Sequence, residues 1–196
     1  MSRITWLLVE RREGWQVYKH EADAPAWSAT VDSASAIKSE LDSLGYLGDP
    51  LVVGLHVNRC VSAEFDADAD AKSRQGEELL YDFEQVVPFS AEDLAAAFIV
   101  GKDRIFGVGV PVAELRPVLE ELQDCGVNIE SVSPSSLLAI QAIEKTQEDQ
   151  FVILAGDCLE CVQLSSKGVC QWYKLPVNES LAAQKLILAG LAESGR

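Results

Sequence analysis

Leu51-Val-Val-Gly-Leu-His-Val57 is a nearly unbroken apolar run in the first third of this 196-residue chain. Such a run predicts a strand covered on both faces, which is typical of a sheet flanked by helices. Two β-prone runs precede it, Ile4–Val9 and Trp15–His20, and Arg-Arg-Glu-Gly between them predicts a hairpin. Ala26–Val31 could add a third strand. Together these runs predict an α/β sheet.

One helix is predicted between the hairpin and the apolar run. Asp32 or Ser33 is a suitable N-cap, the helix reaches about Leu44, and Gly45 stands just past its end. After the apolar run, Cys60–Phe65 is expected to be its hairpin partner.

The middle of the chain predicts a compact unit of helices and strands. A polar stretch rich in small residues, Asp66–Gly76, reads as the exposed connection that leads into it. The expected elements follow in chain order: a helix over Glu77–Val87, strands over Ala95–Val100 and Arg104–Val110, a helix over Pro111–Cys125, a strand over Asn128–Val132 and a helix over Pro134–Glu144.

A second break, the polar stretch Lys145–Asp149, separates the last part of the chain. Three strands are expected after it, over Phe151–Ala155, Leu159–Leu164 and Val169–Leu175, with turn residues between them. A helix from about Ser180 to Glu193 completes the predicted order.

Charge and cysteine content limit the partners and the compartment. The formal net charge is −15, from 31 acidic and 16 basic residues, which disfavours nucleic acids and anionic membrane surfaces because both need Lys and Arg for binding. The charge suits solubility or a basic protein partner. Five scattered cysteines, with no secretory signal and no apolar run near 18 residues, predict free thiols in a reducing cytoplasm.

No residue pattern predicts a catalytic or metal site. Cys158-x-x-Cys161 has zinc or redox spacing, but no second pair or nearby histidine completes four zinc ligands. His20 and His56 flank apolar strands, and no Gly-x-Ser-x-Gly motif accompanies them. The aspartates of Asp66–Asp70 lack the glycine and glutamate of a calcium loop. We therefore expect a protein that is not an enzyme and that needs no cofactor.

Several segments nevertheless carry a family resemblance. Glu78–Asp93 contains a predicted helix followed by Val-Pro-Phe and an acidic pair, and Val112–Cys125 precedes Gly126-Val-Asn-Ile-Glu-Ser-Val-Ser-Pro134. Phe151–Asp157 then begins a new strand. This order resembles the family of PilM, the type IV pilus assembly protein, and GspL, the type II secretion platform protein.

The resemblance implies an actin-like fold, in which two RNase H-like lobes flank a nucleotide cleft. Residues 1–75 and 128–145 would form the first lobe, residues 76–127 an inserted α+β subdomain, and residues 150–196 the beginning of a second lobe.

The loops that bind nucleotide in actin-like proteins are altered in this sequence. The first hairpin has Val9-Glu-Arg-Arg-Glu-Gly-Trp15 where an Asp-x-Gly-x-Ser/Thr loop is expected, and Trp15 occupies the place of a hydroxyl. The second loop would be Gly156–Cys161, in which Asp157 is the candidate acid for a metal-bound nucleotide, although no glycine follows it within the turn. The departures favour the GspL-like condition without nucleotide.

The resemblance implies a non-catalytic scaffold at the cytoplasmic side of a bacterial inner membrane. It would bind a secretion or pilus ATPase or a segment of an inner-membrane assembly protein, and could form a homodimer. A groove between the first lobe and the inserted subdomain is the expected contact surface. Two alternatives remain open: a PilM-type ATP-binding protein that uses Asp157, and a stand-alone interaction domain.

Overall fold

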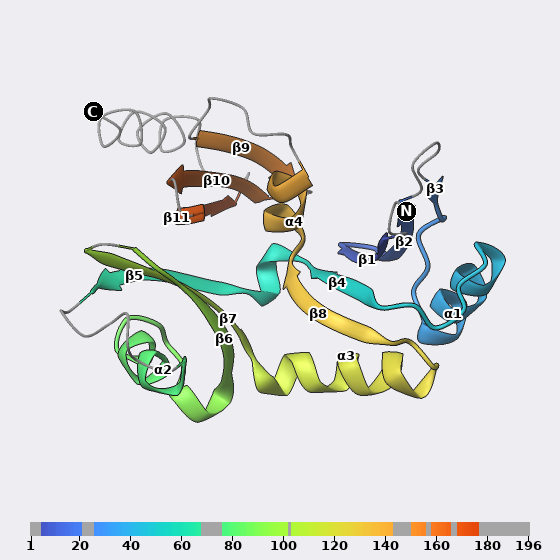
Figure 1. The fold of residues 1–196 in the computed structure, drawn as a ribbon, viewed down its shortest axis with the longest axis horizontal. Helices are drawn as coiled ribbons and strands as arrows, with labels where there is room; N and C mark the ends of the chain where they lie inside the picture. The colour runs from blue at the N-terminus through green and yellow to red at the C-terminus, as the bar shows by residue number, and fades with distance from the viewer. Residues whose placement is uncertain are drawn as a thin grey trace.

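The computed structural model describes residues 5–20, 26–67, 76–101, 103–142, 150–155, 158–165 and 168–176. Within these residues the strands form one five-stranded sheet and two three-stranded sheets (Figure 1). The strands are β1 Thr5–Arg11, β2 Gly14–His20, β3 Ala26–Trp27, β4 Leu51–Leu55, β5 Val61–Asp66, β6 Leu94–Val100, β7 Arg104–Pro111, β8 Ile129–Pro134, β9 Gln150–Ala155, β10 Cys158–Ser165 and β11 Gly168–Pro176. The helices are α1 Ala34–Ser43, α2 Gly76–Glu84, α3 Val112–Asp124 and α4 Ser135–Ala142, with short 3₁₀ helices η1 Val57–Arg59 and η2 Ala91–Asp93.

The five-stranded sheet confirms the α/β prediction. Its order is β3-β2-β1-β4-β8, with an antiparallel β1–β2 hairpin and parallel pairing of β4 to β1 and to β8. Leu51 and Val53 of β4 are fully buried, and α1 contributes the buried Ile37 to the same core. On the sheet's other face α4 packs so closely that a Cβ at Gly54 would lie 3.2 Å from Leu138. The apolar run is therefore covered on both faces.

The caps of α1 follow from its sequence. Ser33 Oγ accepts a hydrogen bond from the backbone N–H of Ala36 at 3.3 Å, which satisfies a free donor of the first turn. Gly45 has φ +81° just past the helix, a left-handed conformation that glycine adopts without steric cost. The predicted helix is confirmed. Strand β3 is shorter than the expected Ala26–Val31. Beyond Trp27, the Ser28 N–H donates to the Val17 carbonyl at 2.9 Å and Val31 forms an isolated bridge to Trp15, without a continuous ladder.

The predicted hairpin between Leu51–Val57 and Cys60–Phe65 is wrong. Strand β5 pairs antiparallel with β7, and the order of this second sheet is β5-β7-β6. The 3₁₀ helix η1 interrupts the chain directly after β4 and redirects it into the other sheet. A pattern of apolar residues predicts a strand but not the strand it pairs with, so the sequence could not reveal this change of sheet.

The second sheet contains the predicted β6–β7 hairpin, and α2 packs against one of its faces. Phe83 of α2 is fully buried, and a Cβ at Gly107 of β7 would approach its ring to 2.8 Å. The predicted helix over Glu77–Val87 ends earlier, at Glu84, where the Glu84 carboxylate accepts the backbone N–H of Ala91 at 2.6 Å. This hydrogen bond links the end of α2 to the first residue of η2.

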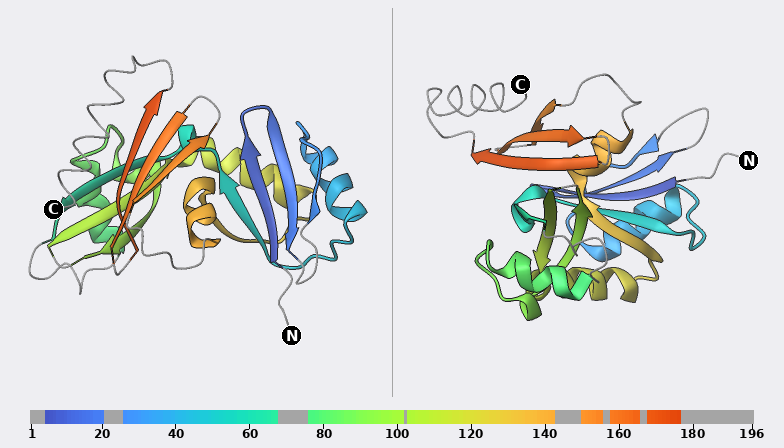
Figure 2. Two further views of the ribbon diagram at one scale, coloured as in Figure 1. Left: turned by 90° about the horizontal axis from the view of Figure 1, so that it is seen from above. Right: turned by 60° about the vertical axis from the view of Figure 1, so that its left-hand side comes forward.

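The third sheet, β11-β10-β9, is the predicted antiparallel group of three strands. It lies over the β5-β7-β6 sheet, as the two views of Figure 2 show. Val162 and Trp172 are buried in one core with Phe106 and Val110 of β7. The helix expected from about Ser180 to Glu193 lies outside the described residues.

The division into a first lobe, an inserted subdomain and a second lobe stays a prediction. The pairing of the strands shows that Val61–Asp66, expected in the first lobe, shares its sheet with the hairpin of the inserted unit. In the described part of the chain, no helix is both long and apolar enough to cross a membrane.

Candidate functional site

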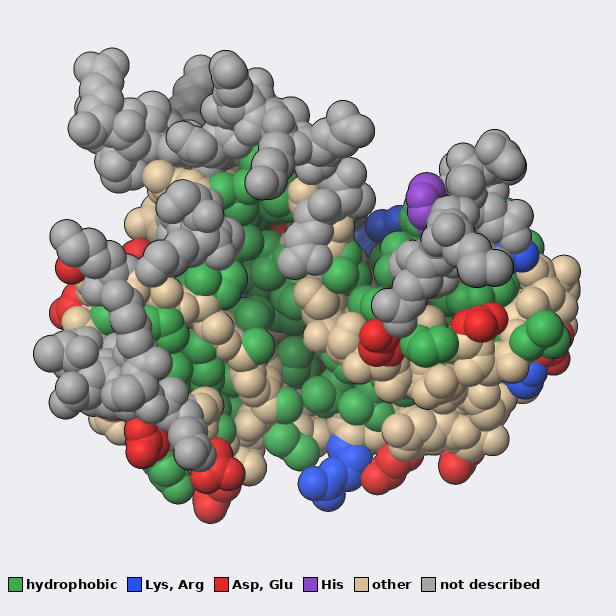
Figure 3. Space-filling model, viewed as in Figure 1, with side chains coloured by type: hydrophobic (Ala, Val, Ile, Leu, Met, Phe, Trp, Pro, Cys, Tyr) green, Lys and Arg blue, Asp and Glu red, His purple; other side chains and the backbone are tan. Residues whose placement is uncertain are grey.

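An apolar groove lies where the five-stranded sheet meets the β5-β7-β6 sheet. Its cavity measures about 180 Å³ and receives residues from four strands and one helix. The lining consists of Leu55 of β4, Ala95–Ala97 of β6, Val108–Val110 of β7, Leu115 of α3 and Val132–Pro134 of β8. Figure 3 shows apolar side chains gathered over the middle of one face, between the two halves of the molecule.

Strand alternation decides which side chains face the groove. A Cβ at Gly109 would point toward α2, 3.1 Å from Phe83. The side chains next to it along β7, Val108 and Val110, therefore point to the opposite face of the sheet. Their cross-strand partners on β6 are Ala97 and Ala95, whose small side chains leave space above the sheet.

Two walls of the groove are edges of sheets. Among the described residues, β6 ends one sheet order and β8 ends another. An edge strand presents unpaired N–H and C=O groups, and proteins commonly protect such edges with lysine, proline or a bulge. Strand β6 reads Leu-Ala-Ala-Ala-Phe-Ile-Val and carries no charged residue or proline. It can therefore accept an extended segment through main-chain hydrogen bonds.

The size and chemistry of the groove favour protein side chains over a small ligand. Pockets for drug-sized molecules measure about 300–1,000 Å³, whereas this cavity holds about 180 Å³. None of its lining residues is charged, so a phosphate group would find no basic partner there. The groove lies in the region for which the sequence predicts a contact surface, and its role in contacts stays a prediction; the sequence did not single out Ala95–Ala97 or Leu115. Three consecutive alanines in a predicted strand are the only signal that could have done so.

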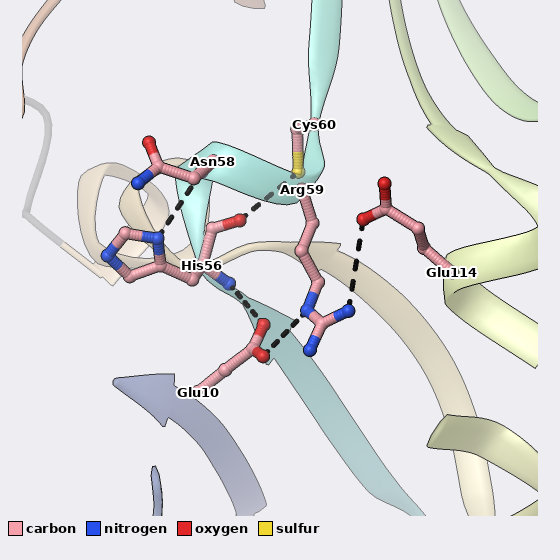
Figure 4. A network of polar contacts seen from close by, with 6 residues as sticks. All are labelled: Glu10, His56, Asn58, Arg59, Cys60 and Glu114. Atoms are coloured by element: carbon pink, nitrogen blue, oxygen red, sulfur yellow. Dashed lines mark hydrogen bonds and ion pairs between the residues drawn. The ribbon is translucent and has the colours of Figure 1, made fainter. Parts of the chain in front are cut away.

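A polar network lies directly after the groove residue Leu55, at the turn that follows β4 (Figure 4). Glu10 of β1 accepts the backbone N–H of His56 at 2.9 Å and Nε of Arg59 at 2.6 Å. Arg59 Nη1 also lies 3.8 Å from Glu114 of α3. Glu10 is buried, and each of its carboxylate oxygens has a protein donor. The carboxylate therefore holds η1 in place rather than offering oxygens to a ligand.

The two histidines take part in separate local contacts. Nδ1 of His56 accepts the backbone N–H of Asn58 at 3.3 Å and caps η1. His20 is exposed at the end of β2, with its Nδ1 3.4 Å from the hydroxyl of Tyr18. The structure does not bring these two rings into one site.

Cys60, Cys125, Cys158 and Cys161 form no disulfide bond. Cys158 and Cys161 stand three positions apart on β10, so their side chains point to opposite faces of the sheet and cannot share a ligand. Burial raises the pKa of Cys161, and burial raises the pKa of Cys60 to about 12. Since the thiolate is the reactive form, both groups are poor nucleophiles. No group of three or more His, Cys, Asp or Glu side chains in the described ranges could hold a metal ion.

The first hairpin turn, where actin-like proteins bind phosphate, is occupied by the protein's own backbone. Trp15 N–H donates to the carbonyl of Val31 at 2.6 Å, and Val31 N–H donates back at 2.9 Å. Gly14 has φ +142°, and a Cβ there would lie 2.2 Å from the Val31 oxygen. Asp157 of the second loop lies outside the described residues, so its role in nucleotide binding stays a prediction.

Comparison with solved structures identifies the fold. No family model and no curated protein matches the chain in sequence. The cytoplasmic domain of EpsL, an inner-membrane component of the type II secretion system of Vibrio cholerae, matches with a TM-score of 0.65 and 21% identity over 88% of this chain and 70% of that one. A Bacteroides thetaiotaomicron protein with an actin-like ATPase fold and unknown function matches with a TM-score of 0.56 and 9% identity over 98% and 77% of the two chains. The chain has the actin-like fold.

A type IV pilus biogenesis complex of PilM and PilN is a further structural match. Its TM-score is 0.71 at 13% identity, over 88% of this chain. This chain spans 61% of the length of the chain of that complex which it matches. The altered hairpin turn and the groove are therefore features of an actin-like chain similar in fold to components of secretion and pilus assembly machines.

Proposed function

We propose that this protein is a non-catalytic scaffold of a type II secretion or type IV pilus assembly platform, at the cytoplasmic side of a bacterial inner membrane. Its groove binds a short extended segment of an inner-membrane assembly protein. The observation that carries this proposal is an uncharged groove bordered by the open edge of β6. The structural similarity to the EpsL cytoplasmic domain and to the PilM–PilN complex supports the same role.

The physical basis of binding is the addition of a strand. Main-chain hydrogen bonds to β6 would supply affinity, and alternate side chains of the segment would fill the space over Ala95, Ala97 and Val110. Because no charged side chain among the described residues lines the groove, the segment's buried residues should be apolar. The ATPase of the machine would be a second partner and would use another surface.

A substitution in the groove tests this proposal. Ala97→Glu places a carboxylate over the floor, where an apolar segment would have to desolvate it. We expect binding of the cytoplasmic segment of the PilN-like protein from the same organism, measured by calorimetry with the full chain, to weaken at least about tenfold. Ala113→Glu is the matched control, since Ala113 is exposed on α3 and does not line the groove. Equal affinity of the two variants would refute the groove as the binding site.

The absence of catalysis is part of the proposal and has its own test. The backbone of the first hairpin turn is bonded to Val31, which supports a protein that does not hold nucleotide there. We expect millimolar Mg-ATP to leave the melting temperature unchanged, because only a ligand that binds the native state raises it. A rise of several degrees, absent with a control nucleotide and lost in Asp157→Ala, would favour the PilM-type ATP-binding alternative instead.

A further inference from the structure

The ion pair of Arg59 with Glu114 joins two elements that border the groove. Leu55 of β4 and Leu115 of α3 both line the groove. Arg59 lies on η1, which begins two residues after Leu55, and Glu114 directly precedes Leu115. The two side chains point toward each other from η1 and α3, as Figure 4 shows. The pair therefore forms a charged border beside a groove whose described lining carries no charge.

The charges at this border do not balance. The Arg59 Nε donates to the buried carboxylate of Glu10 at 2.6 Å, so Glu10 holds the guanidinium. The Glu114 carboxylate lies 3.8 Å from Arg59 Nη1, beyond hydrogen-bond distance, and accepts no hydrogen bond within the part of the chain that the structure describes. Two carboxylates thus face one guanidinium, and a negative charge is left over. The Glu114 side chain is 51% exposed, so a second cation can approach it from solvent.

The occupant proposed for the groove is a source of such a cation, and the present inference rests on that proposed function. Cytoplasmic stretches of inner-membrane proteins are enriched in lysine and arginine close to the membrane. The net charge of −15 attracts a basic segment from a distance, but such a long-range field does not select a position along the segment. A segment that emerges from the groove at Leu115 next meets Glu114, and this local contact does select a position.

We propose that the groove selects an extended segment whose apolar residues are flanked by lysine or arginine, and that Glu114 binds this flanking cation. The apolar residues fill the space over Ala95 and Ala97, and the cation pairs with the Glu114 carboxylate at the exposed border. The uncharged lining disfavours a charge inside the groove, and the border repels an acidic flank. Together they set the register in which the segment binds.

A pair of matched variants on α3 tests the role of Glu114. Glu114→Gln and Glu120→Gln each remove one negative charge, and Glu120 is exposed on the same helix without lining the groove. The ligand is the cytoplasmic segment of the PilN-like protein from the same organism, measured by calorimetry with the full chain. We expect Glu114→Gln to weaken binding about threefold to fivefold in about 50 mM NaCl, and less in about 300 mM NaCl. Glu120→Gln should change the affinity less than about 1.5-fold.

Variants of the segment complete a double-mutant cycle. Each lysine or arginine outside its apolar residues is replaced by glutamine, one at a time. At one position we expect the replacement to weaken binding to the unmodified protein about threefold to fivefold. The same replacement should cause no further loss with Glu114→Gln, because the carboxylate that pairs with the cation is already gone.

Three results would overturn the inference. Equal losses in Glu114→Gln and Glu120→Gln would show that the charge acts only through the field of the whole protein. A loss in Glu114→Gln that is the same for every segment variant would make Glu114 a structural support of the groove. Tight binding of a segment that contains no lysine or arginine would also contradict a flanking cation.

Ala97→Glu distinguishes failure of this inference from failure of the proposed function. If Ala97→Glu leaves the affinity for the segment unchanged, the groove is not the binding site, and both proposals fail. If Ala97→Glu weakens binding while Glu114→Gln does not, the segment occupies the groove but its flanking charge is not bound by Glu114.

Discussion

Phe83→Ala is expected to lower the free energy of unfolding by about 3–5 kcal/mol. Phe83 is 0% exposed at the centre of the core between α2 and the β5-β7-β6 sheet. Its ring lies 5.6 Å from that of Phe98 in an edge-to-face arrangement and packs against Gly107. Gly107 and Gly109, which both lie against the ring, cannot move toward α2 without breaking the hydrogen bonds of their sheet. The cavity that Phe83→Ala creates should therefore stay open.

Denaturation in urea, followed by circular dichroism, measures this loss. Tyr81→Ala is the matched control, since it removes an aromatic ring from the same helix at a position that is 66% exposed. We expect the control to change stability by less than about 0.5 kcal/mol. Similar losses for the two variants would show that α2 does not pack through Phe83 as described.

Glu10→Ala is expected to lower the free energy of unfolding by about 2–3 kcal/mol. The substitution leaves the backbone N–H of His56 and the guanidinium of Arg59 without their carboxylate. Removing one member of a buried pair costs about 3–5 kcal/mol. The Arg59 side chain is 33% exposed, so water can solvate its guanidinium after the substitution. The expected loss of unfolding free energy is therefore smaller than that of a fully buried pair.

The second carboxylate on Arg59 provides the control for this prediction. Glu114 lies 3.8 Å from Arg59 and is half exposed, so Glu114→Ala should cost less than about 0.5 kcal/mol. Both variants can be compared by thermal denaturation at neutral pH. If Glu114→Ala destabilised the protein as much as Glu10→Ala, Glu10 would not be what holds η1 in place.

The groove gives the proposed scaffold a surface that needs no catalytic residue. Its floor is formed by small and β-branched side chains of β6 and β7, and its border is the edge of β6, which no other described strand pairs with. Next to it, η1 carries the contacts of Arg59 with Glu10 and of Lys174 with its backbone carbonyls. The turn formed by η1 therefore lies between the groove and the third sheet.

Local interactions made several elements predictable from residue patterns. The run Leu51–Val57 contains a buried strand because apolar residues must leave water, and the Arg-Arg-Glu-Gly stretch ends in a glycine that the hairpin requires. Ser33 and Gly45 bound a helix because capping involves only neighbouring residues. The same reasoning placed the β6–β7 hairpin and the three strands of the third sheet.

The candidate site depends on contacts between distant residues, which residue patterns do not encode. No local feature shows that Val61–Asp66 leaves the first sheet, that Ala95–Ala97 faces Val132–Pro134, or that Glu160 lies opposite Lys174. The sequence by itself determined the types of the elements, since caps, turns and apolar periodicity act over a few residues. Only the tertiary structure decided which strands pair and where the groove lies, because strand pairing and side-chain burial arise from packing between segments far apart in the chain.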